Sequence, residues 1–458
     1  MSNAMLEAGV AHKTDRLGRT HRFAYFMAKL RRHEPVKVVA FGASITASHK
    51  RGGSAAAPPL HELAWHQQLM SWLRKAFPPA HGEHKLFVMA KGGTDSCFTA
   101  KRIVQAMSHA GKGADLAVLE FGVNDGWRDW QVAGSQGEQE ETQLCFEACT
   151  RTLLQLSSSI AVVHLEFTNA DTGGGGLPKT MMGEAMHRPV SQFYGVPVLS
   201  WRAAIASGVS ARRKMCAKSP PLCRGSVPKA QIDSPMKYFC ACRADDGPDQ
   251  LARLIWYDGT HPRVWGHTMV VDLFVHLAEV ALTRPDKALS VPQSSTNGHT
   301  SVVRLMSEVD VAFNKDFYSS KWCKLKPKRK GGWRCYEDVP TKPGWISDAA
   351  DEAGGLSIAF DVTLTAGRYT VSLGYLRSYA KMGRFSCTVR DTSTGRKTTV
   401  ELDGHWERRV SLLQNKAVAE VTGSFTLSIK TRPLVALRKG NKVKIQSITA
   451  VRGHWLPK

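Results

Sequence analysis

The first two thirds of the chain alternates short apolar runs with longer segments of helical periodicity. Apolar runs at 36–41, 116–121 and 160–167 have the length and composition of buried strands, whereas 61–77 and 138–156 repeat apolar residues at helical spacing. Strands that alternate with helices are typical of βαβ units, in which a parallel sheet is covered by helices on both faces. The pattern therefore predicts an α/β domain in this part of the chain.

The same periodicities predict two further strands and two further helices, at 86–89, 196–199, 100–108 and 268–282. The last of these helices is the most apolar candidate for a membrane span. It carries Asp272, His276 and Glu279 at helical spacing, and no stretch reaches the roughly 18 uninterrupted apolar residues that a span requires. We therefore expect an amphipathic helix packed on a core and no transmembrane segment.

Beyond residue 284 the pattern changes. Residues 285–302 are polar and rich in Pro, Ser and Thr, which is typical of a linker. Six strand-like runs follow without intervening helices, at 356–364, 368–376, 384–389, 398–402, 424–429 and 442–448. Short strands separated by turn signals predict a β-sandwich or jelly roll over 303–458. The expected organisation is an N-terminal extension over 1–35, an α/β domain over 36–284, the linker and the β domain.

The chain is strongly basic, since 62 Lys and Arg against 39 Asp and Glu give a net charge of +23. Such a charge favours polyanionic partners, namely nucleic acid, anionic lipid surfaces or acidic polysaccharides. In the β domain the basic residues concentrate at 321–334 and 430–444. Nucleic acid is the less favoured partner, because no known binding module with a basic stripe and interleaved aromatics is recognisable.

Ten cysteines are too few for a disulfide scaffold in 458 residues, but eight of them form pairs close in sequence, Cys145/Cys149, Cys216/Cys223, Cys240/Cys242 and Cys323/Cys335. The loop settings of the second and fourth pairs suit disulfides. Free buried thiols and a zinc site are the alternatives, although the spacing of the third pair is atypical for zinc. Residues 1–4 resemble the remnant of an expression tag. The expected location is the secretory pathway or the extracellular space, with the targeting signal missing from this sequence, and the cytoplasm is the alternative.

Five polar or glycine residues follow predicted strands or precede the last helix. Ser44 lies where the first strand turns towards a helix, Gly93 and Asn124 follow the next two strands, and Asp258 and His261 precede the last helix. The carboxyl ends of parallel strands meet at one edge of the sheet, where α/β folds place their sites. Ser44 alone could be a helix cap. Together the five supply a nucleophile, a base, a carboxylate that orients the base, and donors for an oxyanion.

In this order the blocks GASIT, GGTDS, GVND and DGTHP resemble those of the SGNH hydrolase superfamily, also called GDSL esterases and lipases. The resemblance covers roughly 36–282 and implies a three-layer flavodoxin-like domain with no metal and no cofactor. It implies that Ser44 is the nucleophile, His261 the general base and Asp258 its orienter. The implied oxyanion donors are the Ser44 and Gly93 amides and the Asn124 side chain.

Two positions depart from the family pattern. Ala43 stands where the commonest pattern has Asp, which alters the hydrogen bonding of the nucleophile turn. The glycine block lacks the frequent Asn, and its doublet leaves Gly92 as a substitute for Gly93.

The resemblance leads us to expect a serine esterase that removes O-acyl groups, chiefly O-acetyl groups, from a polysaccharide or glycoconjugate. The basic β domain is expected to hold the glycan, an acidic polysaccharide. The expected substrate contacts are His49, His187, Trp333 and Trp345, although aromatic residues of a β domain are more often core. The alternatives are a lipase or lysophospholipase, a sugar O-acyltransferase, and a glycan-binding protein with an inactive hydrolase domain.

Overall fold

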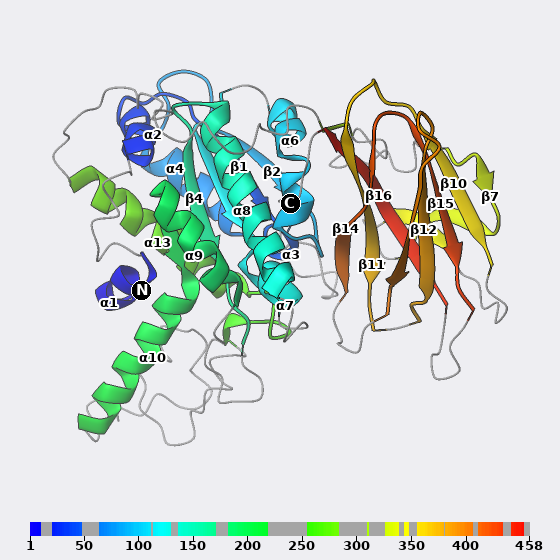
Figure 1. Cartoon of the computed structure of the whole chain (residues 1–458). Coiled ribbons are helices and arrows are strands. Elements are labelled where there is room, and N and C mark those ends of the chain that lie inside the picture. Colours follow the sequence, from blue (N-terminus) through cyan, green and yellow to red (C-terminus); the bar gives the residue numbers. More distant parts are fainter. Residues whose placement is uncertain are drawn as a thin grey trace. The chain divides into compact units, whose positions relative to one another are not determined.

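The computed structural model describes residues 1–10, 21–47, 64–110, 113–129, 136–170, 182–218, 254–283, 309–310, 326–338, 343–347, 355–379, 381–405, 411–433 and 441–452. The chain divides into two compact units (Figure 1). The first comprises Met1–Gly92 and Met107–Gly298, and the second comprises Gly93–Ala106 and His299–Lys458. A short segment from the first two thirds of the sequence thus belongs to the same unit as the C-terminal residues.

The first unit contains a five-stranded parallel sheet in the order β2-β1-β3-β4-β5. Its strands are β1 (Lys37–Gly42), β2 (Lys85–Ala90), β3 (Leu116–Glu120), β4 (Ala161–Glu166) and β5 (Val198–Ser200). All five were expected from their apolar runs, and this strand order is that of flavodoxin-like folds. The prediction of an α/β domain with a parallel sheet is confirmed.

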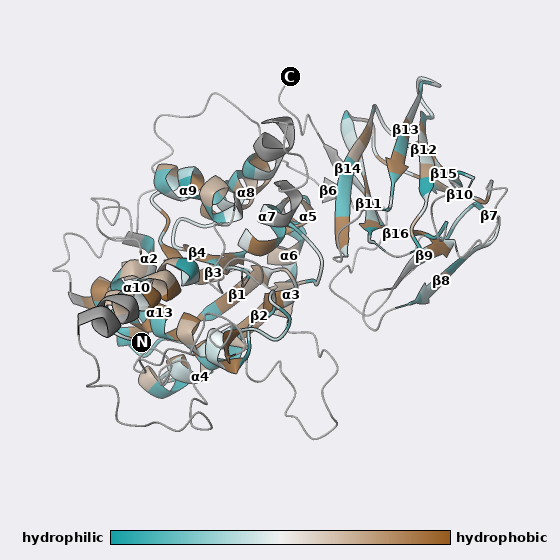
Figure 2. Cartoon of the chain, turned by 90° about the horizontal axis from the view of Figure 1, so that it is seen from below, coloured by the Kyte–Doolittle hydropathy of each residue, from teal (hydrophilic) through white to brown (hydrophobic). Residues whose placement is uncertain are grey.

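The central strands are buried on both faces. All five residues of β3 and all six of β4 are buried, which explains why both strands are largely apolar in sequence (Figure 2), with Glu120, His164 and Glu166 as the exceptions. On one face Val38, Val118 and Val163 pack in a core that includes Trp65 and Phe274, whose rings stack 5.9 Å apart. Burial on both faces requires two layers of helices.

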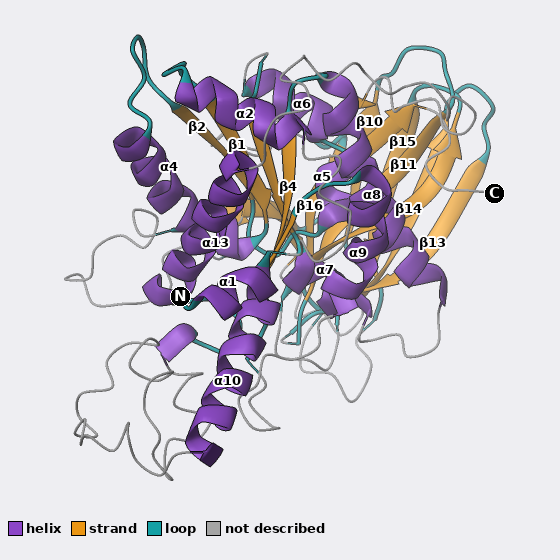
Figure 3. Ribbon diagram, turned by 90° about the vertical axis from the view of Figure 1, so that its left-hand side faces the viewer, coloured by secondary structure: helices purple, strands orange, loops and turns teal. Residues whose placement is uncertain are grey.

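Helices lie on both sides of the sheet (Figure 3). One group of helices in mutual contact is α1 (Asn3–Gly9), α2 (His21–Arg31), α4 (Trp65–Ala76), α10 (Trp201–Lys218) and α13 (Val264–Thr283). The other group is α7 (Gly122–Asp129), α8 (Gln136–Leu156) and α9 (Met182–Tyr194). Of three further helices, α3 (Ser44–Ala47) follows β1, whereas α5 (Ser96–Ala100) and α6 (Ile103–His109) follow one another after β2 and begin within the segment Gly93–Ala106 of the second unit. Among the described residues, no helix has the length and apolar character needed to span a bilayer.

The first ten residues belong to the folded core, which differs from the expected extension. Met5 and Val10 are both 2% exposed, and Val10 forms an antiparallel β-bridge with Leu199 of β5. The Ser2 hydroxyl caps α1 by accepting a hydrogen bond from the Met5 amide at 3.4 Å. Residues 1–4, which resemble a tag remnant in sequence, therefore take part in the start of α1.

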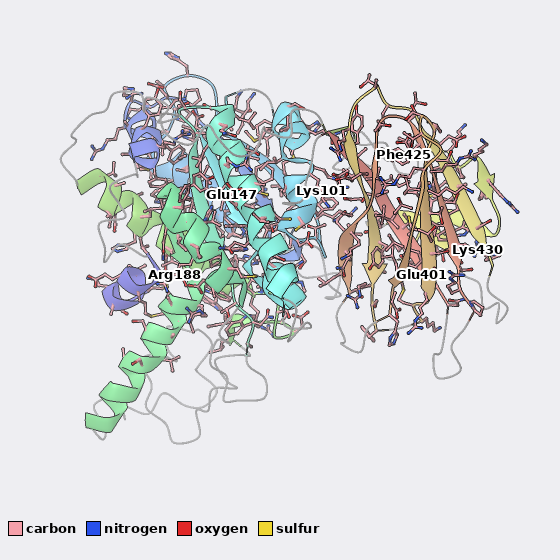
Figure 4. The ribbon with its side chains drawn as sticks, viewed as in Figure 1. Lys101, Glu147, Arg188, Glu401, Phe425 and Lys430 are labelled. Atoms are coloured by element: carbon pink, nitrogen blue, oxygen red, sulfur yellow. The ribbon has the colours of Figure 1, made fainter. Side chains whose placement is uncertain are left out.

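The second unit is built on two antiparallel sheets, as expected for its C-terminal part. One sheet contains, in spatial order, β13 (Lys397–Asp403), β12 (Arg384–Asp391), β15 (Phe425–Thr431), β10 (Ser357–Val362) and β7 (Arg329–Lys330). The other contains β14 (Leu412–Val421), β11 (Tyr369–Arg377), β16 (Val443–Arg452), β9 (Pro343–Ser347) and β8 (Trp333–Glu337), and β6 (Val309–Asp310) pairs with β16. Phe425 is buried in the core of this unit, whereas Lys430 is exposed (Figure 4).

The cysteines are partly oxidised. Cys97, Cys145 and Cys335 are disulfide-bonded, whereas Cys149 and Cys387 are buried and form no disulfide. Cys145 and Cys149 are therefore not bonded to each other, although they lie one helical turn apart. The other expected pairs each include at least one cysteine outside the described residues.

Candidate active site

Ser44 lies on the turn between β1 and α3. The strand ends at Gly42, the helix begins at Ser44, and the Ala47 amide donates to the Ala43 carbonyl at 2.9 Å. Ser44 is partly exposed, whereas Ala43 is buried. This strand-to-helix turn therefore presents the Ser44 hydroxyl at the carboxyl edge of the parallel sheet, as the sequence predicts.

Asp258 and His261 share a tight loop before α13. The Asp258 Oδ1 accepts hydrogen bonds from the Thr260 amide at 3.1 Å and the His261 amide at 2.9 Å. Gly259 has φ of 77°, a conformation that favours glycine, and its carbonyl accepts a hydrogen bond from the Ala170 amide at 2.8 Å. The loop is thereby tied to the segment that follows β4.

The structure brings Ser44, His261 and Asp258 into one hydrogen-bonded chain. His261 Nε2 lies 2.9 Å from Ser44 Oγ, and His261 Nδ1 lies 2.9 Å from Asp258 Oδ2. An ionised carboxylate only accepts, so Nδ1 carries a proton and Nε2 is left to accept the serine proton. These are the positions that a nucleophile, its base and the orienting carboxylate require.

The ionisation of Asp258 suits this arrangement. Burial alone raises the pKa of Asp258, but hydrogen bonds from the His261 side chain and from the His261 and Thr260 amides outweigh that effect. The pKa is held well below its usual range. The carboxylate is therefore charged at neutral pH and favours the imidazolium that forms when His261 takes a proton.

Beneath the Ser44 turn lies a buried carboxyl group that the sequence analysis missed. Glu120 is 0% exposed, and its Oε2 accepts hydrogen bonds from the Thr46 hydroxyl at 2.9 Å and the Ala43 amide at 3.4 Å. Burial raises the pKa of Glu120 to about 8, although these hydrogen bonds act in the opposite direction. An acidic residue at the end of an otherwise apolar strand was the available signal.

Because Gly42 has no side chain, the Thr46 hydroxyl and the Glu120 carboxyl group can meet beside it. A Cβ atom on Gly42 would lie 2.5 Å from the Thr46 Oγ1 and 2.8 Å from the Glu120 Oε2. We expect Gly42→Ala to lower the free energy of unfolding by about 1–3 kcal/mol, the usual cost of overpacking a core. Chemical denaturation measures this loss. The control is Gly423→Ala, because the nearest atom lies 3.9 Å from the added Cβ there. Gly82→Ala would not serve, because Gly82 has a positive φ that disfavours any side chain. A loss no larger than that of Gly423→Ala would contradict the packing described here.

Asn124 lies in the first turn of α7, directly after β3, and is 6% exposed. Its neighbour Asp125 is fully buried and its Oδ2 lies 2.8 Å from His187 Nε2. On the other side of the ring, His187 Nδ1 lies 2.8 Å from Glu166 Oε1 at the end of β4. The His187 ring also stacks on Phe146 of α8, with the centroids 3.5 Å apart. These contacts link α7 to α9 and β4 and so hold the helix that carries Asn124.

The expectation that His187 contacts the substrate is wrong, because the side chain is 1% exposed and both ring nitrogens bind buried carboxylates. Burial lowers the pKa of His187, but the carboxylates of Glu166 and Asp125 outweigh this effect and raise it to about 10. His187 is therefore an imidazolium at neutral pH and bridges Asp125 of α7 and Glu166 of β4.

The remaining predicted residues are placed differently. Gly93 has φ of 81° and belongs to the second compact unit, where its carbonyl accepts a hydrogen bond from the Leu413 amide at 2.6 Å. Its oxyanion role stays a prediction. Trp333 and Trp345 are 0% and 6% exposed in the core of that unit, so they offer no face for a sugar ring, and their expected substrate contact is wrong. His49 lies outside the described residues.

Metal-ligating side chains do not gather in the described part of the chain, since no three His, Cys, Asp or Glu residues there are placed to hold an ion. The Ser44, His261 and Asp258 side chains are arranged for proton transfer to an imidazole and attack by a serine oxygen.

No protein-family model matches the chain, and no curated protein sequence matches it either. Among solved structures, the chain is similar to a two-domain esterase (CEX) active on acetylated mannans, with a TM-score of 0.61 and 17% sequence identity, over 98% of this chain and 99% of that one. A structure of such an esterase co-crystallized with mannopentaose has a TM-score of 0.56 and 16% identity, over 99% of both chains.

The match to a putative GDSL-like lipase from Parabacteroides merdae extends over 54% of this chain and 97% of that one, with 14% identity and a TM-score of 0.35. At these identities the likeness to the two-domain esterase establishes the fold. The chain shares the fold of this two-domain esterase, and the prediction of an α/β domain with a parallel sheet followed by a β-rich domain is confirmed.

Proposed function

We propose that the protein is a serine esterase that removes O-acyl groups, chiefly O-acetyl groups, from a polysaccharide or glycoconjugate. The observation that carries the proposal is the hydrogen-bonded chain from Ser44 through His261 to Asp258. The fold shared with an esterase active on acetylated mannans supports an acetylated carbohydrate as the substrate class.

The geometry supports a two-step reaction. His261 Nε2 takes the Ser44 proton while Oγ attacks the ester carbonyl, and the imidazolium then protonates the departing sugar oxygen. Water, activated in turn by His261, attacks the acyl-enzyme and releases the acid. Asp258 remains ionised throughout and stabilises the imidazolium. The Ser44 amide and the Asn124 side chain are the proposed donors to the oxyanion.

Esters of different chain length test this function and its alternatives. The purified protein is expected to hydrolyse p-nitrophenyl acetate faster than long-chain esters and to release acetate from acetylated mannan, whereas Ser44→Ala does neither. A preference for long-chain esters would favour a lipase or lysophospholipase. Acyl transfer to an added sugar in preference to water would favour an acyltransferase. Glycan binding without hydrolysis of any ester would favour a binding protein.

Asn124→Ala is expected to lower kcat by about 10² to 10³-fold, because one donor to the oxyanion is lost. Steady-state kinetics on p-nitrophenyl acetate measures the change, and circular dichroism checks that α7 is retained. An effect confined to KM would assign Asn124 to substrate binding and contradict the oxyanion role.

The second unit is proposed to retain an acidic glycan through exposed cations around β7. Lys326, Arg329 and Lys330 are exposed, whereas Lys442 and Lys444 are paired with Asp338. Replacing the three exposed cations by Gln is expected to weaken retention on an acidic polysaccharide column at low salt, because exposed charges act over a Debye length of about 8 Å at physiological salt. Gln at the exposed Arg396 and Lys397 is the control. Equal retention of both variants and the wild type would contradict the assignment.

A secretory or extracellular location is part of the same proposal. The disulfide-bonded Cys97, Cys145 and Cys335 support it, because disulfides persist in oxidising compartments. An acetylated polysaccharide substrate is consistent with that location.

A further inference from the structure

Glu120 occupies a fixed place beside the nucleophile turn. In the parallel pairing of β1 with β3, Glu120 is the register partner of Gly42, the last residue of β1. The pairing directs a carboxyl group of β3 to the turn on which Ser44 lies. At the turn itself Ala43 has only a methyl group. A carboxyl group therefore reaches the turn from the neighbouring strand.

Thr46 connects this carboxyl group to two further side chains. Its hydroxyl donates to Glu120 Oε2 at 2.9 Å and accepts from Trp65 Nε1 at 3.3 Å. Its carbonyl accepts from His66 Nε2 at 2.9 Å. Thr46, Trp65, His66 and Glu120 are all buried, at 2% exposure or less. The short helix that begins at Ser44 is thus held from β3 and from α4.

We propose that Glu120 is a positioning residue for the nucleophile: through the Thr46 hydroxyl and the Ala43 amide it fixes the turn that presents Ser44 to His261. The inference rests on the proposed serine-esterase function. Because reacting groups must be held closely, a displacement of about 1 Å in such a turn can cost about 100-fold in rate. Glu120 touches neither the substrate nor the reacting atoms, so its effect is exerted through Thr46 and the backbone.

Conservative and disruptive variants separate positioning from bulk. At neutral pH the Glu120 carboxyl group is largely protonated, so Glu120→Gln keeps its size, its neutrality and an acceptor oxygen. Glu120→Leu removes the acceptor. Thr46→Val removes the hydroxyl at nearly unchanged side-chain volume, and Thr46→Ser keeps the hydroxyl. Glu120→Leu and Thr46→Val therefore remove the Glu120–Thr46 hydrogen bond from either side, whereas Glu120→Gln and Thr46→Ser retain it.

Glu120→Leu and Thr46→Val are each expected to lower kcat on p-nitrophenyl acetate by about 10- to 100-fold with KM within about 2-fold, whereas Glu120→Gln and Thr46→Ser stay within about 3-fold of the wild type. The double variant Glu120→Leu with Thr46→Val should lose less than the product of the two single losses, because both remove the Glu120–Thr46 hydrogen bond, whereas the Ala43 and Trp65 contacts are each removed by one variant only. If Glu120→Leu does not fold, Thr46→Val alone carries the test.

A wild-type kcat in Thr46→Val would overturn the proposal. Equal losses of kcat in Glu120→Gln and Glu120→Leu would also overturn it, and so would an increase in KM without a loss of kcat in Thr46→Val and Glu120→Leu. Ser44→Ala, measured under the same conditions, distinguishes a failure of the proposed function from a failure of the positioning role alone. If Ser44→Ala keeps wild-type turnover, the proposed function fails. If Ser44→Ala is inactive while the Thr46 and Glu120 variants behave as wild type, the function stands and only the positioning role fails.

Discussion

Ser44→Ala is expected to lower kcat for ester hydrolysis by about 10⁴-fold or more, and His261→Ala should cause a loss of the same order. The reason is the single hydrogen bond of 2.9 Å between His261 Nε2 and Ser44 Oγ, through which nucleophile and base act as one unit. The double variant should therefore be no less active than either single variant. Asp258→Asn is expected to retain more activity, since it removes the orienter and leaves nucleophile and base in place.

Kinetics on p-nitrophenyl acetate measure these losses, and circular dichroism shows whether each variant is folded. Ser207→Ala is a matched control, because Ser207 is partly exposed on α10 and its hydroxyl donates only to the Ala4 carbonyl at 3.1 Å among the hydrogen bonds described. It should keep wild-type turnover. Multiplicative losses in the double variant Ser44→Ala with His261→Ala would mean that the two residues do not act together.

His187→Leu is expected to lower the free energy of unfolding by about 3–5 kcal/mol. The substitution removes the cation between Asp125 and Glu166, which are 0% and 1% exposed, and leaves two carboxylates buried without it. Breaking a buried ion pair from one side is costly, because the remaining charge loses its partner without regaining water. Urea denaturation followed by helical circular dichroism measures the effect, since most of the described helices lie in the first unit.

His81→Leu is the control for this experiment, because His81 is exposed, and it should change stability by less than about 0.5 kcal/mol. The pKa of His187 is raised above its ordinary value of 6.5 to about 10. Its protonation therefore contributes fully to stability below pH 6.5, and this contribution is lost as the pH rises towards about 10. A loss of less than about 1 kcal/mol in His187→Leu near neutral pH would contradict the role of the buried cation.

The strands of the sheet could be predicted because each depends on local sequence, and the resemblance of four short blocks to a known family led us to expect that Ser44, His261 and Asp258, the proposed triad, meet. A continuous apolar run of five to eight residues identifies a strand buried on both faces, and the ends of parallel strands lie at one edge. Ser44 and His261 are 217 residues apart, yet strand ends and the order of four short blocks were enough to bring them together.

The contacts around the triad could not be predicted, because they depend on register and on side chains that meet across elements. Glu120 reaches Thr46 only through the pairing of β1 with β3, and His187 meets Asp125 and Glu166 only when α9 packs against α7 and β4. An isolated histidine in the sequence gives no indication that two carboxylates enclose it.

The aromatic residues of the β domain illustrate the same limit. Trp333 and Trp345 were expected to offer flat surfaces to a sugar, but both lie in the core. Short strands with irregular alternation do not reveal which face of a sheet a residue occupies, because a shift of one residue exchanges the faces. The N-terminal helix α1 was also missed, since seven residues give too short a period to recognise.

Labelling with a fluorophosphonate tests the central claim most directly, because such a reagent forms a stable adduct with an activated serine. One equivalent of label is expected to abolish ester hydrolysis, peptide mass spectrometry is expected to find the label on Ser44, and His261→Ala should be labelled far more slowly. Full activity in protein labelled at Ser44, or loss of activity with the label on a different serine, would contradict it.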